Sequence, residues 1–238
     1  MSRIKWDLQG QHFYETGVNQ GVLYTIDPSK ETTNKYNAGV AWNGLTSVSE
    51  SPEGAEVSAI YADNIKYLNL MSAEDFKGTI EAYTYPDEFA ECDGSATLGG
   101  IAGINMGQQT RKLFGLCYTT KIGNDETADL GYKIHIVYNC LASPSERSYE
   151  TINDSPEAIT FSWEFSTTPV SFYVTEGEGA SAKQVKKSTA TLVIDSTKVD
   201  AAKLKLLEDT LFGTDAVGQI AGTDPTLLLP DEIKDLLA

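Results

Sequence analysis

Apolar and polar side chains alternate along two neighbouring segments in the middle of the chain. In RKLFGLCYTTK (111–121) and GYKIHIVYN (131–139), every second residue is apolar over most of the length. This is the period of a β-strand with a buried face. The polar segment IGNDETADL (122–130) separates the two. Together they predict an antiparallel hairpin with a long tip.

Further stretches have the same strand character. AITFSWEFS (158–166) is the most regular, because its apolar side chains share one face, which must be buried by a second sheet or a helix. EVSAIYADNIKYLNL (56–70) is apolar with few breakers and predicts a strand, or a hairpin. KGTIEAYTY (77–85) and STATLVID (188–195) predict one strand each. The face predicted for AITFSWEFS consists of Ile159, Phe161, Trp163 and Phe165.

Helical spacing is found near the end of the chain. Leucines recur with a near-helical period in KVDAAKLKLLEDTLF (198–212), and Gly213 follows as a C-cap. PDEIKDLL (230–237) opens with proline and acids, as short helices do. After Pro86, the segment PDEFAEC (86–92) predicts one or two helical turns.

The order of these elements predicts a mainly β fold with one principal helix (α+β) in a single domain over residues 1–238. Residues 1–50 mix Gly, Asn and Thr with scattered aromatics and favour an arm, about 1–30, followed by short strands. Residues 93–109 and 214–229 are predicted loops, and about 214–238 forms a C-terminal tail. No linker or internal repeat divides the chain.

The charge balance excludes several partners. There are 18 Lys and Arg against 34 Asp and Glu, which gives a net charge of −16. A protein that binds nucleic acid tightly needs many Lys and Arg residues to contact the phosphates, so this net charge argues against nucleic-acid binding. An anionic membrane surface would repel the chain for the same reason. No apolar run reaches the roughly 18 residues that span a bilayer, and the first residues lack the apolar core of a secretory signal.

The residue patterns of catalysis and cofactor binding are missing. Cys92, Cys117 and Cys140 form no CxxC pair and are expected to be buried small residues. His12 and His135 have no metal-ligand spacing, and His135 is expected to face solvent or an interface. The acidic segment 124–129 does not match a calcium-binding loop and favours a solvated hairpin tip. We therefore expect no catalytic residues, no metal site and no cofactor.

Several long segments resemble one protein family. They are GVAWNGLTSVSESPEGAE (39–56), YADNIKYLNLMSAEDFKGTIEAYTYPDEFAECDG (61–94), the predicted hairpin with its flanks (107–149) and TINDSPEAITFSWEFSTTPV (151–170). In these segments the chain resembles the major tail protein, or tail tube protein, of long-tailed bacteriophages and prophages of Gram-positive bacteria. The resemblance runs from about residue 10 to the final PDEI.

The resemblance implies a structural protein that is not an enzyme. Subunits of this family form hexameric rings that stack into a tube, with a β-sandwich or half-barrel core and a flanking helix. The implied partners are further copies of the chain, a tape-measure protein, a tail terminator and baseplate or tail-tip proteins. DNA passes through the tube without specific binding. The implied location is the virion tail, of the flexible non-contractile kind, after synthesis in the host cytoplasm. We expect no added immunoglobulin-like domain of the kind that some relatives carry.

The composition suggests how such a tube would handle DNA. Six copies carry 6 × (−16) = −96 charges per ring. We expect acidic and hydroxyl side chains to line the lumen, with the opposite faces of the same strands forming the core, so that DNA passes without adhesion.

Two sets of residues are candidates for contacts between subunits. Segment 50–94 has 11 acids and 2 lysines. It is a candidate partner for a basic loop on a neighbour, with a merely solvated loop as the alternative. That loop contains Lys183, Lys186 and Lys187. The adjacent Leu227, Leu228 and Leu229 dock either on the subunit itself or on a neighbour. For ring stacking, the candidate segments are 1–30, 28–55, 93–109 and 214–238.

A second interpretation comes from a different class of protein. Abundant aromatics and acidic turns also suit a non-catalytic β-sandwich module that binds carbohydrate or another ligand. Electron microscopy of the purified protein distinguishes the two, because only the first forms rings or tubes.

Overall fold

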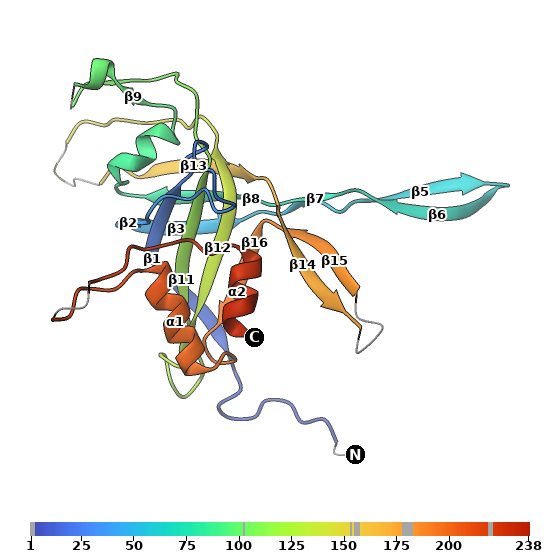
Figure 1. The fold of residues 1–238 in the computed structure, drawn as a ribbon. Helices are drawn as coiled ribbons and strands as arrows, with labels where there is room; N and C mark the ends of the chain where they lie inside the picture. The colour runs from blue at the N-terminus through green and yellow to red at the C-terminus, as the bar shows by residue number, and fades with distance from the viewer. Residues whose placement is uncertain (1–2, 102, 153, 155–157, 178–182, 219–220) are drawn as a thin grey trace.

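In the computed structural model, the chain folds around one curved antiparallel sheet, with helices on one side and long β-hairpins projecting from it (Figure 1). The structure describes residues 3–101, 103–152, 154, 158–177, 183–218 and 221–238. The strands are β1 Tyr14–Thr25, β2 Val40–Trp42, β3 Leu45–Glu50, β4 Glu53–Gly54, β5 Val57–Ala62, β6 Ile65–Met71, β7 Glu74–Asp75, β8 Lys77–Ala82, β9 Ala96–Thr97, β10 Asn105–Met106, β11 Phe114–Gly123, β12 Gly131–Ala142, β13 Phe161–Thr167, β14 Val170–Glu176, β15 Lys183–Thr189 and β16 Thr191–Asp195. The helices are α1 Ala201–Leu211, α2 Pro230–Leu237 and the short 3₁₀ turns η1 Asp87–Glu91 and η2 Leu98–Gly100.

The main sheet has eight strands in the order β2-β1-β11-β12-β13-β8-β3, and β16 pairs with β12 beside β13. Its two ends are joined by the Asn43–Gly44 turn between β2 and β3. Because the chain passes directly from one end of the sheet to the other, the sheet curls towards closure. The mostly β, α+β architecture predicted from the sequence is therefore confirmed.

The inner face of the curled sheet holds an aromatic core. Trp163 is completely buried, and its ring centroid lies 5.8 Å from that of Trp42 and 5.1 Å from that of Phe89. Phe89 comes from η1, whose turn begins after Pro86 and contributes this side chain to the core. The short helical segment predicted after Pro86 is confirmed as a 3₁₀ turn.

The outer face of the sheet is covered by α1 and α2. The side chains of Ile134, Ile136 and Tyr138 on β12 pack with Leu207 of α1 and Ile233 of α2. Helix α1 begins where the Asp200 carboxylate accepts hydrogen bonds from the backbone N–H groups of Ala202 and Lys203. Both predicted helices and the predicted hairpin of β11 and β12 are confirmed. Both faces of this hairpin are buried, not one as the alternation suggested.

The prediction of an N-terminal arm over 1–30 was wrong beyond residue 13. Strand β1 (14–25) lies inside the main sheet, between β11 and β2. Gly17 and Gln20 both have positive φ, of 70° and 50°, and the register with β11 shifts on either side of Asn19. These irregularities interrupt the alternation that would have marked a strand in the sequence.

Smaller differences concern strand boundaries. The predicted strand 188–195 is interrupted at Ala190, between β15 and β16. The predicted loop 93–109 contains the short β9–β10 ladder and η2. Ile159 lies before β13 and is 39% exposed, so the apolar face predicted there begins at Phe161.

Candidate assembly surfaces

A two-stranded apolar ribbon projects from the body of the molecule. It consists of β5 and β6 (57–71) and extends furthest from the sheet in Figure 1. Its tip is a two-residue turn in which Asp63 and Asn64 have φ of 51° and 65°, the left-handed geometry of a tight hairpin. The hairpin that the sequence offered as one alternative for 56–70 is therefore confirmed, and we call it the ribbon.

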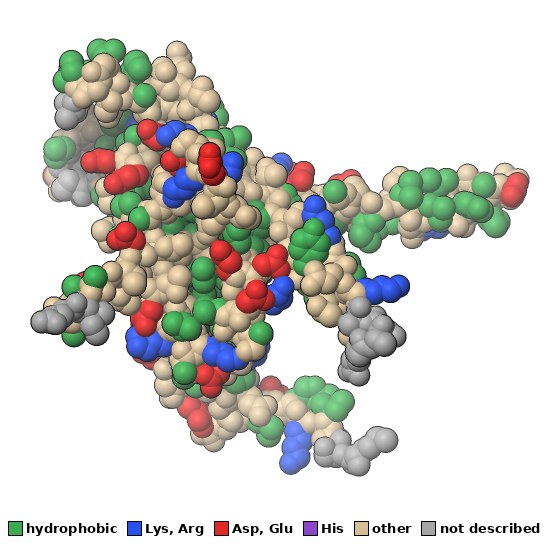
Figure 2. Space-filling view, viewed as in Figure 1, with side chains coloured by type: hydrophobic (Ala, Val, Ile, Leu, Met, Phe, Trp, Pro, Cys, Tyr) green, Lys and Arg blue, Asp and Glu red, His purple; other side chains and the backbone are tan. Residues whose placement is uncertain are grey.

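Both faces of the ribbon are apolar and exposed. Val57 pairs with Met71 on one face, and Ile60 pairs with Leu68 on the other. Figure 2 shows these hydrophobic side chains along the projection. The exposed fractions are Val57 55%, Ile60 39%, Tyr61 69%, Ile65 65%, Tyr67 68%, Leu68 39%, Leu70 54% and Met71 71%. A two-stranded hairpin is marginally stable in water without a further layer, and an apolar patch of this extent marks an interaction site.

The root of the ribbon is fastened to the sheet. Glu50 ends β3, and its Oε1 accepts a hydrogen bond of 2.7 Å from the Tyr118 hydroxyl. His135 Nδ1 lies 3.5 Å from the same oxygen, and its ring stacks on that of Tyr118 at 4.7 Å between centroids. The neighbouring His135 holds the pKa of Glu50 below its usual value, and the Tyr118 bond adds to this effect. His135 is 9% exposed, so the expectation that it faces solvent or an interface was wrong: it joins β12 to the ribbon root.

The outer face of β13, β8 and β3 is a polar surface on the back of the aromatic core. Glu164 pairs with Thr79, and Thr79 pairs with Ser49 on the next strand. Ser162, Glu81 and Ser47 form a second row, in which the Ser47 hydroxyl donates to Glu81 Oε2 at 2.9 Å. Lys77 lies on the same face beside Ser166, and its Nζ is 2.6 Å from Glu53 Oε2. This hydroxyl-acid face belongs to strands that bury Ile80, Trp163 and Phe165 on their other side. The sheet centre at β11 and β12 lacks it, because both faces are buried there.

The three candidate lysines lie on a strand, not in a loop. Lys183, Lys186 and Lys187 belong to β15, which pairs along its whole length with β14. Alternation puts Lys186 beside Tyr173 on the exposed face, while Lys183 and Lys187 share the face of Val174 and Val185, which are partly buried. Lys187 Nζ lies 2.7 Å from Glu176 Oε1 in the same hairpin. The structure therefore separates the three charges instead of presenting one basic patch.

The leucines of the C-terminal tail dock on the subunit's own body. Leu227 is completely buried beside Tyr36 and Gly115, and Leu228 and Leu229 are partly buried against the same core. The backbone carbonyl of Leu228 accepts a 2.8 Å hydrogen bond from the Tyr138 hydroxyl. Of the two alternatives left open by the sequence, docking on the subunit itself is the one observed.

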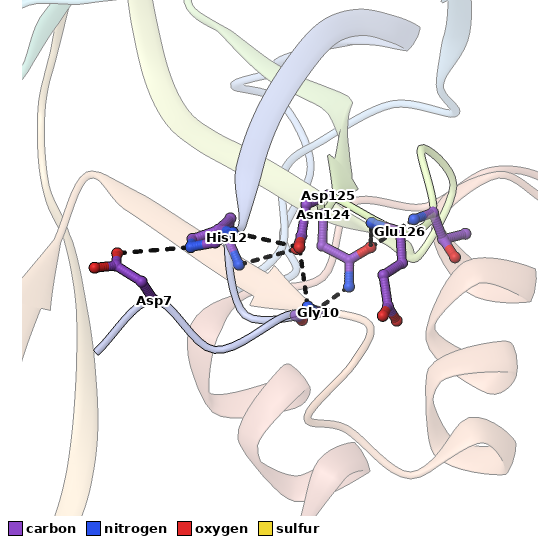
Figure 3. A network of polar contacts seen from close by, with 7 residues as sticks. Asp7, Gly10, His12, Asn124, Asp125 and Glu126 are labelled. Carbon is purple, nitrogen blue, oxygen red and sulfur yellow. Dashed lines mark hydrogen bonds and ion pairs between the residues drawn. The ribbon is translucent and has the colours of Figure 1, made fainter. Parts of the chain in front are cut away.

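The N-terminal segment is held at its base by polar contacts with the β11–β12 tip (Figure 3), and residues further out are exposed. The Asp125 carboxylate at the β11–β12 tip accepts hydrogen bonds from the backbone N–H of Gly10 at 3.0 Å and of His12 at 3.2 Å. Asn124 Nδ2 donates to the Gly10 carbonyl at 2.9 Å. The bond from Gly10 is the largest effect that lowers the pKa of Asp125. Ile4 and Trp6, further out, are 70% and 72% exposed.

Reactive chemistry is not concentrated anywhere in the described residues. The three cysteines are buried, and burial raises the pKa of Cys92 to about 12 and also raises the pKa values of Cys117 and Cys140. No group of three or more His, Cys, Asp or Glu among these residues is placed to hold a metal ion. In the same part of the chain, no helix has the length and apolarity to cross a membrane.

A surface hollow of about 560 Å³ between β1, β2 and Pro225 is lined by apolar and amide side chains, with no titratable group.

Comparison with known proteins adds little to these surfaces. No protein-family model and no curated protein matches the chain. Among solved structures, the chain is similar to one from an extracellular contractile injection system, the PVC sheath–tube complex in its extended state. The TM-score is 0.27 at 12% identity, over 78% of this chain and 95% of that chain. A likeness this distant carries no argument about function.

Proposed function

We propose that the protein is a non-catalytic structural subunit that assembles with copies of itself into the tube of a phage-type tail. The ribbon carries this proposal, because its two apolar faces are both open in the single subunit. Each buried aliphatic side chain contributes roughly 1.5–3 kcal/mol, so covering the ribbon favours association strongly. The sequence resemblance to tail tube proteins supports the same function.

In the proposed tube, the hydroxyl-acid face of β13, β8 and β3 lines the lumen. Its opposite side is the aromatic core, so the wall is backed by packed, buried side chains. Glu81 and Glu164 repel phosphate, and Lys77 on the same face is paired with Glu53, so its charge is not free to displace counterions from DNA. From the resemblance to tail tube proteins, we further propose that the subunits form hexameric rings, that the genome passes through the tube, and that a tape-measure protein is a partner.

Electron microscopy of the purified chain tests the proposal. We expect rings or tubes, and dispersed particles at every concentration would contradict it. The variant Ile60→Ser/Leu68→Ser/Leu70→Ser should remain folded but lose assembly, because these side chains are exposed in the subunit. The matched control replaces three exposed apolar residues elsewhere, Ile152, Val193 and Leu206, with serine and should assemble normally. If dispersed protein instead bound glycans or another ligand at the hollow beside Pro225, the ligand-binding alternative would hold.

A further inference from the structure

Two exposed apolar segments of opposite charge lie apart on the subunit. The first is the ribbon with the short β4–β7 ladder at its base (53–75), which carries 5 acids and 1 lysine, a net charge of 1 − 5 = −4. The second is the segment from Arg3 to Leu8, with 2 cations and 1 acid, a net charge of 2 − 1 = +1 in a chain of −16. Figure 1 shows the N-terminal segment and the ribbon leaving the body at different places.

The N-terminal segment has the pattern of an edge strand that has no sheet in the subunit. Ile4, Trp6 and Leu8 alternate with Arg3, Lys5 and Asp7, yet residues 3–8 lie outside every strand. The apolar set is 70%, 72% and 39% exposed. Alternation of this kind favours a strand with one buried face, so the segment requires an acceptor.

The ribbon has the features of that acceptor. It has only two strands, so its outer edges offer backbone groups to a third. Its apolar faces match Ile4, Trp6 and Leu8, and Glu56, Glu74 and Asp75 at its root are exposed and opposite in sign to Arg3 and Lys5. Opposite charges steer association and fix register.

We infer that residues 3–8 of one copy cover the ribbon of a second copy. This deepens the proposed function and rests on it. Because Asp125 holds Gly10 and His12, the base of the donor segment stays fixed while the residues before it reach outward. Each copy carries donor and acceptor at different places, so the contact is head-to-tail and propagates into closed rings or extended stacks.

Tryptophan emission provides the first test. The chain has three tryptophans, and Trp42 and Trp163 are 2% and 0% exposed while Trp6 is 72% exposed. Assembly should shift the emission to shorter wavelength and reduce quenching by acrylamide several-fold, and Trp6→Phe should abolish both changes. Assembled particles in which Trp6 stays fully quenchable would overturn the inference and leave the proposed function standing. Absence of particles would overturn the proposed function itself.

Cross-linking between copies identifies the acceptor. Leu8→Cys protein mixed with Leu68→Cys protein should form disulfide-linked dimers under a mild oxidant. The native cysteines are buried and should not compete with the two introduced cysteines. Leu206→Cys on the exposed side of α1 replaces Leu8→Cys in the control mixture and should give at least tenfold less product. Equal yields from the two mixtures would overturn the assignment.

Charge exchange tests the role of the opposite signs. Arg3→Glu/Lys5→Glu and Glu56→Lys/Glu74→Lys should each impair assembly, and a chain carrying all four changes should recover it. Failure of the four-fold variant to recover, with both double variants impaired, would contradict pairing of these two segments.

Discussion

The aromatic core and the ribbon are both β-structure rich in large apolar side chains, yet their surroundings are opposite. In the core, Trp163 and Ile80 are completely buried under strands from both ends of the curled sheet and under Phe89. In the ribbon, Tyr67 and Met71 are 68% and 71% exposed. Composition alone therefore does not separate buried from exposed β-structure in this chain. In the core, other residues of the same subunit bury the apolar side chains, whereas the ribbon side chains remain exposed in the single subunit.

The largest expected effect is at the centre of the core. Trp163→Ala removes a buried ring that contacts Trp42, Phe89 and Phe161, and should lower the free energy of unfolding by about 3–5 kcal/mol. Tyr67→Ala on the ribbon should change it by less than about 0.5 kcal/mol. Urea unfolding of dispersed subunits measures both. Equal destabilisation by the two variants would mean that the ribbon is packed within the subunit, against the comparison.

The tail leucines give the next largest effect. Leu227→Ala should destabilise the subunit by about 2–5 kcal/mol, because it opens a cavity beside Tyr36. Leu206→Ala, on the half-exposed side of α1, is the matched control and should be nearly neutral. If Leu227→Ala left unfolding unchanged but blocked assembly, the tail would belong with the ribbon as an interface element.

A smaller effect concerns the helical cover of the outer face. Asp200→Ala removes the N-cap of α1 and should cost about 1 kcal/mol in unfolding free energy. Asp209→Ala, which removes only the exposed pair with Lys205, should cost about 0.3–0.5 kcal/mol. The reverse ranking in thermal unfolding would contradict the capping geometry.

The smallest effect is the pH dependence of the ribbon root. The folded subunit lowers the pKa of Glu50, so its carboxylate stabilises the fold above the unfolded-state pKa, and this contribution is lost as pH falls through the lower folded-state value. The difference in urea midpoint between the native chain and Glu50→Gln should therefore be present at neutral pH and shrink in acid. A difference that grows on acidification would have the wrong sign.

Much of the fold could be predicted from periodicity. The β11–β12 hairpin, β13 and α1 repeat their apolar positions with one regular period, and each was located from the sequence. The sequence did not predict β1 as a long central strand. Gly17, Asn19 and Gln20 interrupt the alternation of its apolar and polar residues where the register with β11 shifts. The sequence did not predict the β14–β15 hairpin, because its exposed face carries serine, threonine, glutamine and lysine, a composition typical of loops.

The candidate surfaces were less predictable for a physical reason. Apolar residues on both faces of β5 and β6 indicate burial, but the sequence does not say which chain provides the cover. The aromatic neighbour of His135 and its carboxylate partner come from β11 and β3, so only the tertiary fold brings them together. The three lysines were expected in a basic loop, so the strand alternation of β15 that separates them could not be anticipated.

Hydrogen exchange along the ribbon tests the central claim most directly. In dispersed subunits, the amides of 57–71 should exchange rapidly, since a two-stranded hairpin without a cover opens readily, while those of β11 and β12 stay protected. In assembled particles, ribbon exchange should slow by at least tenfold with β11 and β12 unchanged. A ribbon equally protected before assembly, or one that stays unprotected within particles, would contradict its role as the interface.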